Sequence, residues 1–326
     1  KYWGKYANQI PANPSISYTL NHCNTQTSME FLANEPFSVQ TFLAGNEEVK
    51  FAEKIEKYFK NIEQYLPWIL KGKYIIKTEN TFPHSSGIAS SASGFGAIAS
   101  CLMELDKNFS SEIRDASFEI KKASFLARLG SGSACRSVKG NLVVWGNQEN
   151  IEGSSNLFGV PFSRKVHSVF ENYQDTILLV DKGEKQVSST VGHDLMHDHP
   201  FAARRFEQAH ENIDQLIPIF ENGDLEAFIK IVESEALTLH AMMMTSMPYF
   251  ILMKPNTLQI INAIWKYRNE TKTPVCFTLD AGANVHVLYP ENVKESVLQF
   301  IQSELVGYCQ NGQYLCDQIG FGAATL

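Results

Sequence analysis

The chain has 326 residues, of which 44% are hydrophobic, and its 35 acidic and 28 basic side chains give a net charge of −7. This length and apolar content are typical of a globular protein with two domains and exclude a disordered or fibrous chain. The basic residues form no cluster, which argues against nucleic acid as a partner. The longest apolar stretch, 241–253, falls short of the ~20 residues that a membrane helix needs.

The six cysteines form no C-x-x-C pair and lie mostly among apolar residues. Such thiols are typical of a reduced, cytoplasmic protein. The chain begins at a lysine and shows no signal peptide, so nothing in the sequence directs export. We therefore expect a cytoplasmic protein with no membrane partner.

The first part of the chain predicts strands at 15–20, 25–32 and 37–43, where apolar and polar residues alternate. A helix is predicted at 47–66, because its apolar residues share one helical face and Pro67 follows. A further strand is predicted at 73–78.

That strand leads into Pro83-His-Ser-Ser-Gly-Ile-Ala-Ser-Ser-Ala-Ser-Gly-Phe-Gly96, a turn of small residues that precedes a helix. Its glycines at 87, 94 and 96 let backbone N–H groups approach a ligand, and its serine hydroxyls add donors. A helix N-terminus behind the turn favours an anion. A flexible linker is the alternative interpretation, although the apolar residues within the turn indicate packing. The Walker and Rossmann glycine patterns are both absent.

The next helix is expected to begin at a Ser110-Ser-Glu cap and to end at Gly130, with four inward residues, Ile113, Phe118, Phe125 and Leu126. A second turn of small residues, 130–137, then presents Arg136 among serines. Its planar guanidinium suits a bidentate grip on carboxylate or phosphate. An exposed arginine near a helix end explains Arg136 alone equally well.

A strand at 141–145, a loop at 147–165 and an apolar strand at 176–180 follow. In the second half, helices are predicted at 201–222, 224–242 and 257–268. Strands at 274–279 and 284–289, a helix at 293–303 and a glycine-containing tail complete the chain. We place an N-terminal domain at 1–180 and a C-terminal domain at 181–326.

Asp280 follows an apolar strand and precedes Ala281-Gly282. A carboxylate at the end of a strand suits a general base or an aligning group. The commoner role of such an aspartate is to cap its own turn.

Three histidines, His193, His197 and His199, have spacings that fit zinc. No cysteine lies nearby, and a metal site is the less favoured interpretation. The methionines at 242–244 are expected to fill a core.

Five segments together resemble the diphosphomevalonate decarboxylase family of the GHMP kinase superfamily: Lys1-Tyr-Trp-Gly-Lys5, 83–94, Ala127-Arg-Leu-Gly-Ser-Gly-Ser-Ala-Cys-Arg-Ser137, Val187-Ser-Ser-Thr-Val-Gly192 and Phe277-Thr-Leu-Asp-Ala-Gly-Ala-Asn284. The resemblance implies an α+β protein of the GHMP kinase fold. Its N-terminal ATP-binding domain is expected to resemble domain 2 of ribosomal protein S5, and its C-terminal domain to be ferredoxin-like.

The implied activity is the ATP- and Mg²⁺-dependent decarboxylation of mevalonate 5-diphosphate to isopentenyl diphosphate, by way of 3-phosphorylation, in isoprenoid biosynthesis. By this resemblance Asp280 aligns or deprotonates the 3-hydroxyl, Lys5 sets its charge and Arg136 holds the C1 carboxylate. The residues implied to bind the substrate are Tyr2, Lys5, Ser131, Ser133, Arg136 and Thr190. Those implied to bind the nucleotide are Ser85, Ser86, Gly87, Ala89, Ser90, Ser91 and Ser93, with Ser91 also meeting the metal.

Alternatives to this activity stay open. The same chemistry could act on mevalonate 5-phosphate or a 3,5-bisphosphate, because Lys5, Arg136 and Asp280 serve the C1 and C3 end. A GHMP small-molecule kinase would not need Arg136 on a carboxylate. A non-catalytic ligand sensor is disfavoured by the joint presence of Lys5 and Asp280. A homodimer is common among members of the family.

Overall fold

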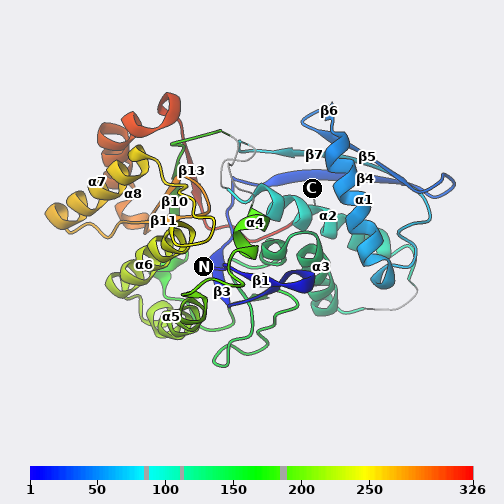
Figure 1. Cartoon of the computed structure of the whole chain (residues 1–326), viewed down its shortest axis with the longest axis horizontal. Coiled ribbons are helices and arrows are strands. Elements are labelled where there is room, and N and C mark those ends of the chain that lie inside the picture. Colours follow the sequence, from blue (N-terminus) through cyan, green and yellow to red (C-terminus); the bar gives the residue numbers. More distant parts are fainter. Residues whose placement is uncertain (84–87, 111–113, 184–188, 326) are drawn as a thin grey trace.

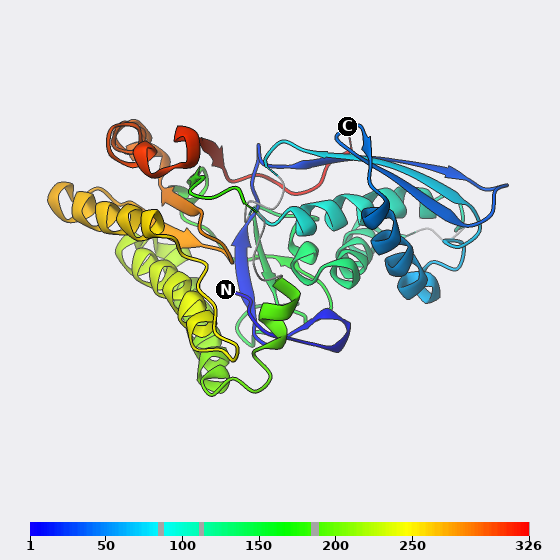
Figure 2. The same cartoon turned by 45° about the horizontal axis from the view of Figure 1, so that its top comes forward.

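The computed structural model describes residues 1–83, 88–110, 114–183 and 189–325, without the side chains of Ser189 and Thr190. Figures 1 and 2 show two lobes side by side, with the blue and cyan elements in one and the yellow to red helices in the other. The start of the chain lies between the lobes. Among the helices described, none is long and apolar enough to cross a membrane.

Within the described ranges the strands form four sheets. In the N-terminal lobe these are a hairpin of β1 (Lys5–Tyr6) and β2 (Ile10–Pro11), a sheet of β3 (Ser15–Tyr18), β8 (Leu142–Trp145) and β9 (Val160–Pro161), and a sheet of β4 (Thr25–Leu32), β7 (Lys73–Asn80), β5 (Ser38–Leu43) and β6 (Asn46–Glu47). All pairs are antiparallel except β5 with β7. The C-terminal lobe contains an antiparallel sheet in the order β11 (Cys276–Leu279), β12 (Val285–Tyr289), β10 (Gln174–Leu178) and β13 (Tyr314–Gln318).

The α-helices are α1 (Val49–Ile62), α2 (Ser90–Asp106), α3 (Ala116–Gly130), α4 (Ser189–Asp194), α5 (Ala202–Asn222), α6 (Leu225–Met244), α7 (Pro255–Thr271) and α8 (Lys294–Phe300). A π-helical turn, Ile301–Leu305, extends α8, and a 3-10 helix at Gly132–Arg136 follows α3.

Each lobe has its own core. In the N-terminal lobe, Phe59 of α1, Phe95 of α2 and Leu126 of α3 pack in one buried cluster with residues of β5 and β7. In the C-terminal lobe, α7 and α8 pack apolar residues such as Ile260 and Phe300 against β11 and β12. Burial of these apolar surfaces is the main force that forms each lobe.

Several sequence predictions are confirmed. The strand at 25–32 has the predicted bounds. Helix α5 ends at Gly223, which adopts a left-handed φ of +77°, a conformation that glycine reaches without strain. Asp224 caps α6 by accepting the Ala227 N–H at 3.0 Å. The mixed helices and sheets agree with the predicted α+β class.

Other predictions are wrong. Helix α3 is capped by Asp115, which accepts the Phe118 N–H, rather than by Ser110. Phe118 is 48% exposed, because it lies in the first turn and faces away from the core, and Ile113 lies outside the described residues.

Two stretches predicted as irregular contain strands. The tail includes β13, which completes the C-terminal sheet by pairing with β10, and the loop at 147–165 includes β9. β9 has only two residues, and β13 (Tyr-Leu-Cys-Asp-Gln) does not alternate apolar with polar residues, so neither pattern indicated a strand. The domain boundary at 180 stays a prediction. Strand β10 precedes residue 180, and its two neighbours in the sheet, β12 and β13, both follow that residue.

Two glycines of the 83–96 turn lie inside α2 rather than in a loop. Gly96 faces the 130–137 turn, where a Cβ would lie 3.1 Å from the Cβ of Ser137. On the neighbouring helix, a Cβ on Gly130 would lie 2.1 Å from Cδ1 of the buried Phe95 ring. These glycines let α2, α3 and the turn approach closely. A Cβ on Gly94, by contrast, would meet nothing within 4 Å.

We predict that Gly130→Ala lowers the free energy of unfolding by about 1–3 kcal/mol, the cost of overpacking a core. The matched change Gly94→Ala is expected to raise it by about 0.5–1 kcal/mol, because alanine is favoured over glycine inside a helix. Urea denaturation of both variants measures the difference. Equal stabilities for the two variants would contradict the packing described for Gly130.

Candidate functional site

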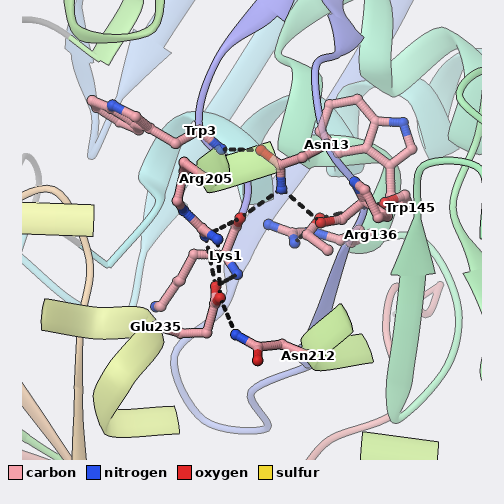
Figure 3. Close-up of polar contacts among 10 residues, drawn as sticks. Lys1, Trp3, Asn13, Arg136, Trp145, Arg205, Asn212 and Glu235 are labelled. Carbon is pink, nitrogen blue, oxygen red and sulfur yellow. Dashed lines mark hydrogen bonds and ion pairs between the residues drawn. The ribbon is translucent and has the colours of Figure 1, made fainter. Parts of the chain in front are cut away.

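The segment from Lys1 to Lys5 lies between the lobes and is tied to the N-terminal lobe by Asn13 (Figure 3). The Asn13 side chain accepts the Trp3 N–H at 3.3 Å and donates to the Lys1 carbonyl at 2.8 Å. It also donates to the Pro14 carbonyl at 2.7 Å. One buried amide therefore fixes the backbone at Lys1 and at Trp3.

Two helices of the C-terminal lobe hold the same segment from the other side (Figure 3). Arg205 of α5 forms a bidentate pair with Glu235 of α6, with N···O distances of 3.0 and 2.6 Å, and also donates to the Lys1 carbonyl at 3.0 Å. Asn212 donates to Glu235 at 2.6 Å, and the main-chain nitrogen of Lys1 contacts the same carboxylate. Buried ions of opposite charge are stable only when paired in this way.

Helix α4 makes a third contact with the segment. The Gly4 N–H donates to Nδ1 of His193 at 2.9 Å. The imidazole packs on two aromatic rings, with centroid distances of 4.3 Å to Tyr2 and 4.5 Å to Trp3. Gly4 has a φ of +93°, a conformation that other residues rarely adopt.

The 130–137 turn faces Tyr2 and Ser15. Arg136 donates from Nη1 to the buried Ser15 hydroxyl at 2.7 Å. A Cβ on Gly132 would lie 3.0 Å from the Tyr2 hydroxyl, so this hydroxyl lies against the turn beside Ser131 and Ser133. Burial raises the pKa of Tyr2, while the positive charge of Arg136 opposes that rise. At neutral pH Tyr2 is therefore a neutral hydrogen-bond donor.

Asp280 follows β11, as predicted, and its backbone is fixed by neighbours. Its carbonyl accepts the Gly282 N–H at 2.8 Å and a hydrogen bond from Nε2 of His240 at 3.1 Å. The buried Thr257 hydroxyl donates to the Ala283 carbonyl at 2.7 Å. The turn that carries Asp280 is thus anchored to both α6 and α7.

The charges of Lys1, Arg136 and Asp280 act on one another. Burial lowers the pKa of the Lys1 ammonium; Asp280 opposes that change, whereas Arg136 adds to it. Burial also lowers the pKa of Arg136, and Asp280 is among the groups that oppose the change. Two cations from the N-terminal lobe thus lie within electrostatic reach of a carboxylate from the C-terminal lobe.

Lys1 is a site residue that the sequence interpretation missed, although it begins the family-like segment Lys1-Tyr-Trp-Gly-Lys5. Lys5, which was assigned the charge-setting role, lies along a hollow of about 270 Å³ with Asp194 and His197, and its charge contributes to lowering the pKa of His193. The proposed role of Lys5 toward Asp280 stays a prediction.

The candidate nucleotide loop is described from Ile88 onward, so Ser85, Ser86 and Gly87 lie outside the described residues. Ala89 adopts a left-handed conformation before α2, and no side chain of the described residues caps the helix. Ser91 is exposed in the first turn of α2, with its hydroxyl 3.5 Å from Nζ of Lys54. An uncapped N-terminus with a nearby ammonium suits a phosphate.

Two other candidate nucleotide ligands lie in the first turn of α2. Ser93 shares a 2.6 Å hydrogen bond with Thr25, so its hydroxyl already has a partner. Ser90 is partly exposed, and its carbonyl accepts a hydrogen bond from Ser93 at 3.2 Å.

The remaining candidates lie on or near α4. Thr190 belongs to this helix, but its side chain lies outside the description. His199 is buried and Nε2 lies 3.0 Å from the Met242 carbonyl, whereas His197 is exposed. In the part of the chain that the structure describes, no group of three or more His, Cys, Asp or Glu could hold a metal. Met242 and Met243 are buried as predicted, and Met244 is exposed.

Two protein-family models match the chain. Residues 1–157 match the diphosphomevalonate decarboxylase-like N-terminal domain, and residues 176–319 match the mevalonate 5-diphosphate decarboxylase C-terminal domain.

Among individual proteins, the diphosphomevalonate decarboxylase of Debaryomyces hansenii is 29% identical over 92% of this chain and 79% of its own length. The phosphomevalonate decarboxylase of Haloferax volcanii is 28% identical over 86% of this chain and 80% of its own. A solved structure of MDDEF in complex with MVAPP, AMPPCP and magnesium has a TM-score of 0.83 and 27% identity, and the match covers 99% of this chain and 93% of that one.

We predict that Arg205→Met lowers the free energy of unfolding by about 3–5 kcal/mol, because it leaves the Glu235 carboxylate buried without its main partner. The double variant Arg205→Met/Glu235→Met is expected to recover at least half of this loss, since the uncompensated charge is then gone. Urea denaturation of the two variants and the parent checks this. A double variant no more stable than the single one would contradict the pairing described.

Proposed function

Because the chain belongs to the diphosphomevalonate decarboxylase family, we propose that it converts mevalonate 5-diphosphate and ATP to isopentenyl diphosphate, ADP, phosphate and CO₂. The observation that carries this proposal is that the Asp280 carboxylate lies within electrostatic reach of the buried Lys1 and Arg136 cations. A substrate with a carboxylate at C1 and a tertiary hydroxyl at C3 needs both a cation and a base in one place.

In the first step, the C3 oxygen attacks the γ-phosphorus of ATP, the bond from that phosphorus to ADP breaks, and the hydroxyl proton passes to Asp280. Hydrogen bonds from Gly282 and His240 to the Asp280 carbonyl fix the backbone from which the carboxylate extends. We assign the proton to this carboxylate because its place in the site is fixed before the substrate binds. Lys1 supplies a positive charge beside it. We assign Lys1 the task of orienting Asp280 and the C3 oxygen.

In the second step, the C3–O bond breaks and phosphate leaves with the bonding pair. The C1–C2 bond then breaks, CO₂ departs, and its electron pair forms the C2–C3 double bond. Arg136 holds the C1 carboxylate in place, with its own orientation set by Ser15. Asp280 passes the proton that it took in the first step to the departing phosphate, and the carboxylate, ionised again, stabilises the positive charge that develops at C3.

We assign the nucleotide to the N-terminus of α2. Its uncapped N–H groups, the exposed Ser91 hydroxyl and the Lys54 ammonium provide donors and positive charge for the phosphates. Mg²⁺ bound at Ser91 would neutralise the phosphates during transfer, and the structure of MDDEF holds magnesium together with AMPPCP. Phosphate contacts from Ser85, Ser86, Gly87, Ala89, Ser90 and Ser93 belong to the same proposal.

For the other end of the substrate, we propose that Tyr2, Lys5, Ser131, Ser133 and Thr190 hold its phosphate groups. This proposal is supported by the position of the Tyr2 hydroxyl against the 130–137 turn and of Lys5 along a polar hollow.

Mevalonate 5-phosphate is a second candidate substrate, because a phosphomevalonate decarboxylase is among the similar proteins. All six cysteines are free, which supports a reducing, cytoplasmic location. The homodimer stays a prediction.

The proposal is tested by incubating the protein with ATP, Mg²⁺ and mevalonate 5-diphosphate and following ADP and CO₂ together. We expect the two products in a 1:1 ratio, because phosphate loss and decarboxylation follow each phosphoryl transfer. Mevalonate 5-phosphate, assayed in parallel, is expected to give a lower kcat/KM. ADP without CO₂ would indicate a kinase and contradict the proposal, and turnover of the monophosphate alone would change the substrate.

A further inference from the structure

His193 is a buried histidine for which the reaction steps above have no role. It lies in α4, a helix of six residues that begins directly after the 184–188 stretch. A helix this short is not stable by itself and depends on tertiary contacts for its position. What holds α4 therefore determines where Thr190, on the same helix, is placed.

Two contacts attach α4 to the Lys1–Lys5 segment. Gly192 lies so close to Trp3 that a Cβ would approach its ring to 2.7 Å. His193 follows, with its ring against both Tyr2 and Trp3 and with Nδ1 accepting the Gly4 N–H. The first contact is only close packing, whereas the second is directional because the amide needs an acceptor at one position.

The hydrogen bond also fixes the state of the imidazole. An Nδ1 atom that accepts a hydrogen bond is unprotonated, so the proton of the neutral ring is on Nε2. Burial, assisted by the charge of Lys5 and opposed by Asp280, lowers the pKa of His193 to about 3. The ring is thus a neutral acceptor toward Gly4 at physiological pH.

The residues joined by His193 all belong to the proposed substrate side of the site. Tyr2 packs against its ring in a tilted arrangement, Lys5 follows Gly4 directly, and Thr190 is on the same helix. The proposed nucleotide ligands that the structure describes at the start of α2 have other partners: Ser93 pairs with Thr25, and Ser91 lies near Lys54. A substitution at His193 is therefore expected to change the affinity for mevalonate 5-diphosphate but not the affinity for ATP.

We propose that His193 is a positioning residue that couples α4 to the Lys1–Lys5 segment and thereby sets the affinity for the phosphorylated end of the substrate. The proposal rests on the function assigned above and deepens it. Without an acceptor for the Gly4 amide, the segment and α4 are correctly docked in only a fraction of the molecules. The apparent affinity for the substrate falls by that fraction.

Two variants separate the ring from the acceptor. His193→Phe keeps an aromatic ring between Tyr2 and Trp3 but has no acceptor, whereas Oδ1 in His193→Asn occupies the place of Nδ1. We expect His193→Phe to raise KM for mevalonate 5-diphosphate about tenfold, as for a buried amide left unpaired, and KM for ATP to stay within about twofold. His193→Asn is expected to restore most of the substrate affinity.

His199→Phe is the matched control. This buried histidine belongs to the segment after α4, where Nδ1 accepts the Phe201 N–H at 3.1 Å and Nε2 lies 3.0 Å from the Met242 carbonyl. We expect it to lower the Tm without changing the ratio of the two KM values. A ratio changed equally by His199→Phe and His193→Phe would overturn the proposal, and so would a His193→Phe enzyme with unchanged KM for the substrate.

A measurement on the unmodified protein does not depend on activity. The ¹⁵N shifts of His193, assigned by comparison with His193→Asn, are expected to show the Nε2–H tautomer throughout pH 5–8. An Nδ1–H tautomer, or a protonation within that range, would overturn the coupling. If the unmodified protein does not turn over mevalonate 5-diphosphate, the proposed function fails. If it does and His193→Phe is unaffected, only the coupling fails.

Discussion

The hydrogen bonds that hold the Lys1–Lys5 segment between the two lobes are the constraint on which the site depends. Asn13 binds this backbone from the N-terminal lobe, and Arg205, itself fixed by Glu235, binds the same Lys1 carbonyl from the C-terminal lobe. Each lobe thus contributes one hydrogen bond to the Lys1 carbonyl, and the two together fix the backbone that carries the Lys1 side chain. The segment therefore links the domain that presents Arg136 and the α2 N-terminus to the domain that presents Asp280.

The chemistry follows from what the lobes contribute at this junction. Burial of an ammonium and a guanidinium is unfavourable in a low dielectric, which is why the pKa values of Lys1 and Arg136 are lowered. The Asp280 carboxylate offsets part of that cost, and an anionic substrate would offset more. Fixed charges that need no reorganisation when charge develops are the main means by which enzymes stabilise transition states. In the function that we propose, the same charges favour a ligand with a carboxylate beside a reacting hydroxyl.

Much of this arrangement could be predicted from the sequence. Local signals placed Asp280 after β11, Gly223 after α5 and Arg136 in a small-residue turn, because each depends on neighbours in the chain. Contacts between distant residues could not be predicted from periodicity. Gly130 faces Phe95, and the short strand β13 completes a sheet with β10. Lys1 was overlooked because its role depends on Asp280, which is 279 positions away in the chain, and His193 because its partner is the backbone of Gly4.

The central claim is that Asp280 acts on the C3 oxygen within a site whose nucleotide is held elsewhere, at α2. Asp280→Asn tests it most directly, because the amide keeps the shape of the side chain and removes its charge and basicity. The measurement is the rate of CO₂ release in a single turnover, together with the Kd of ATP by calorimetry. We expect turnover to be abolished while the Kd changes by less than about threefold, a difference of under 1 kcal/mol. Near-normal CO₂ release in this variant would contradict the account.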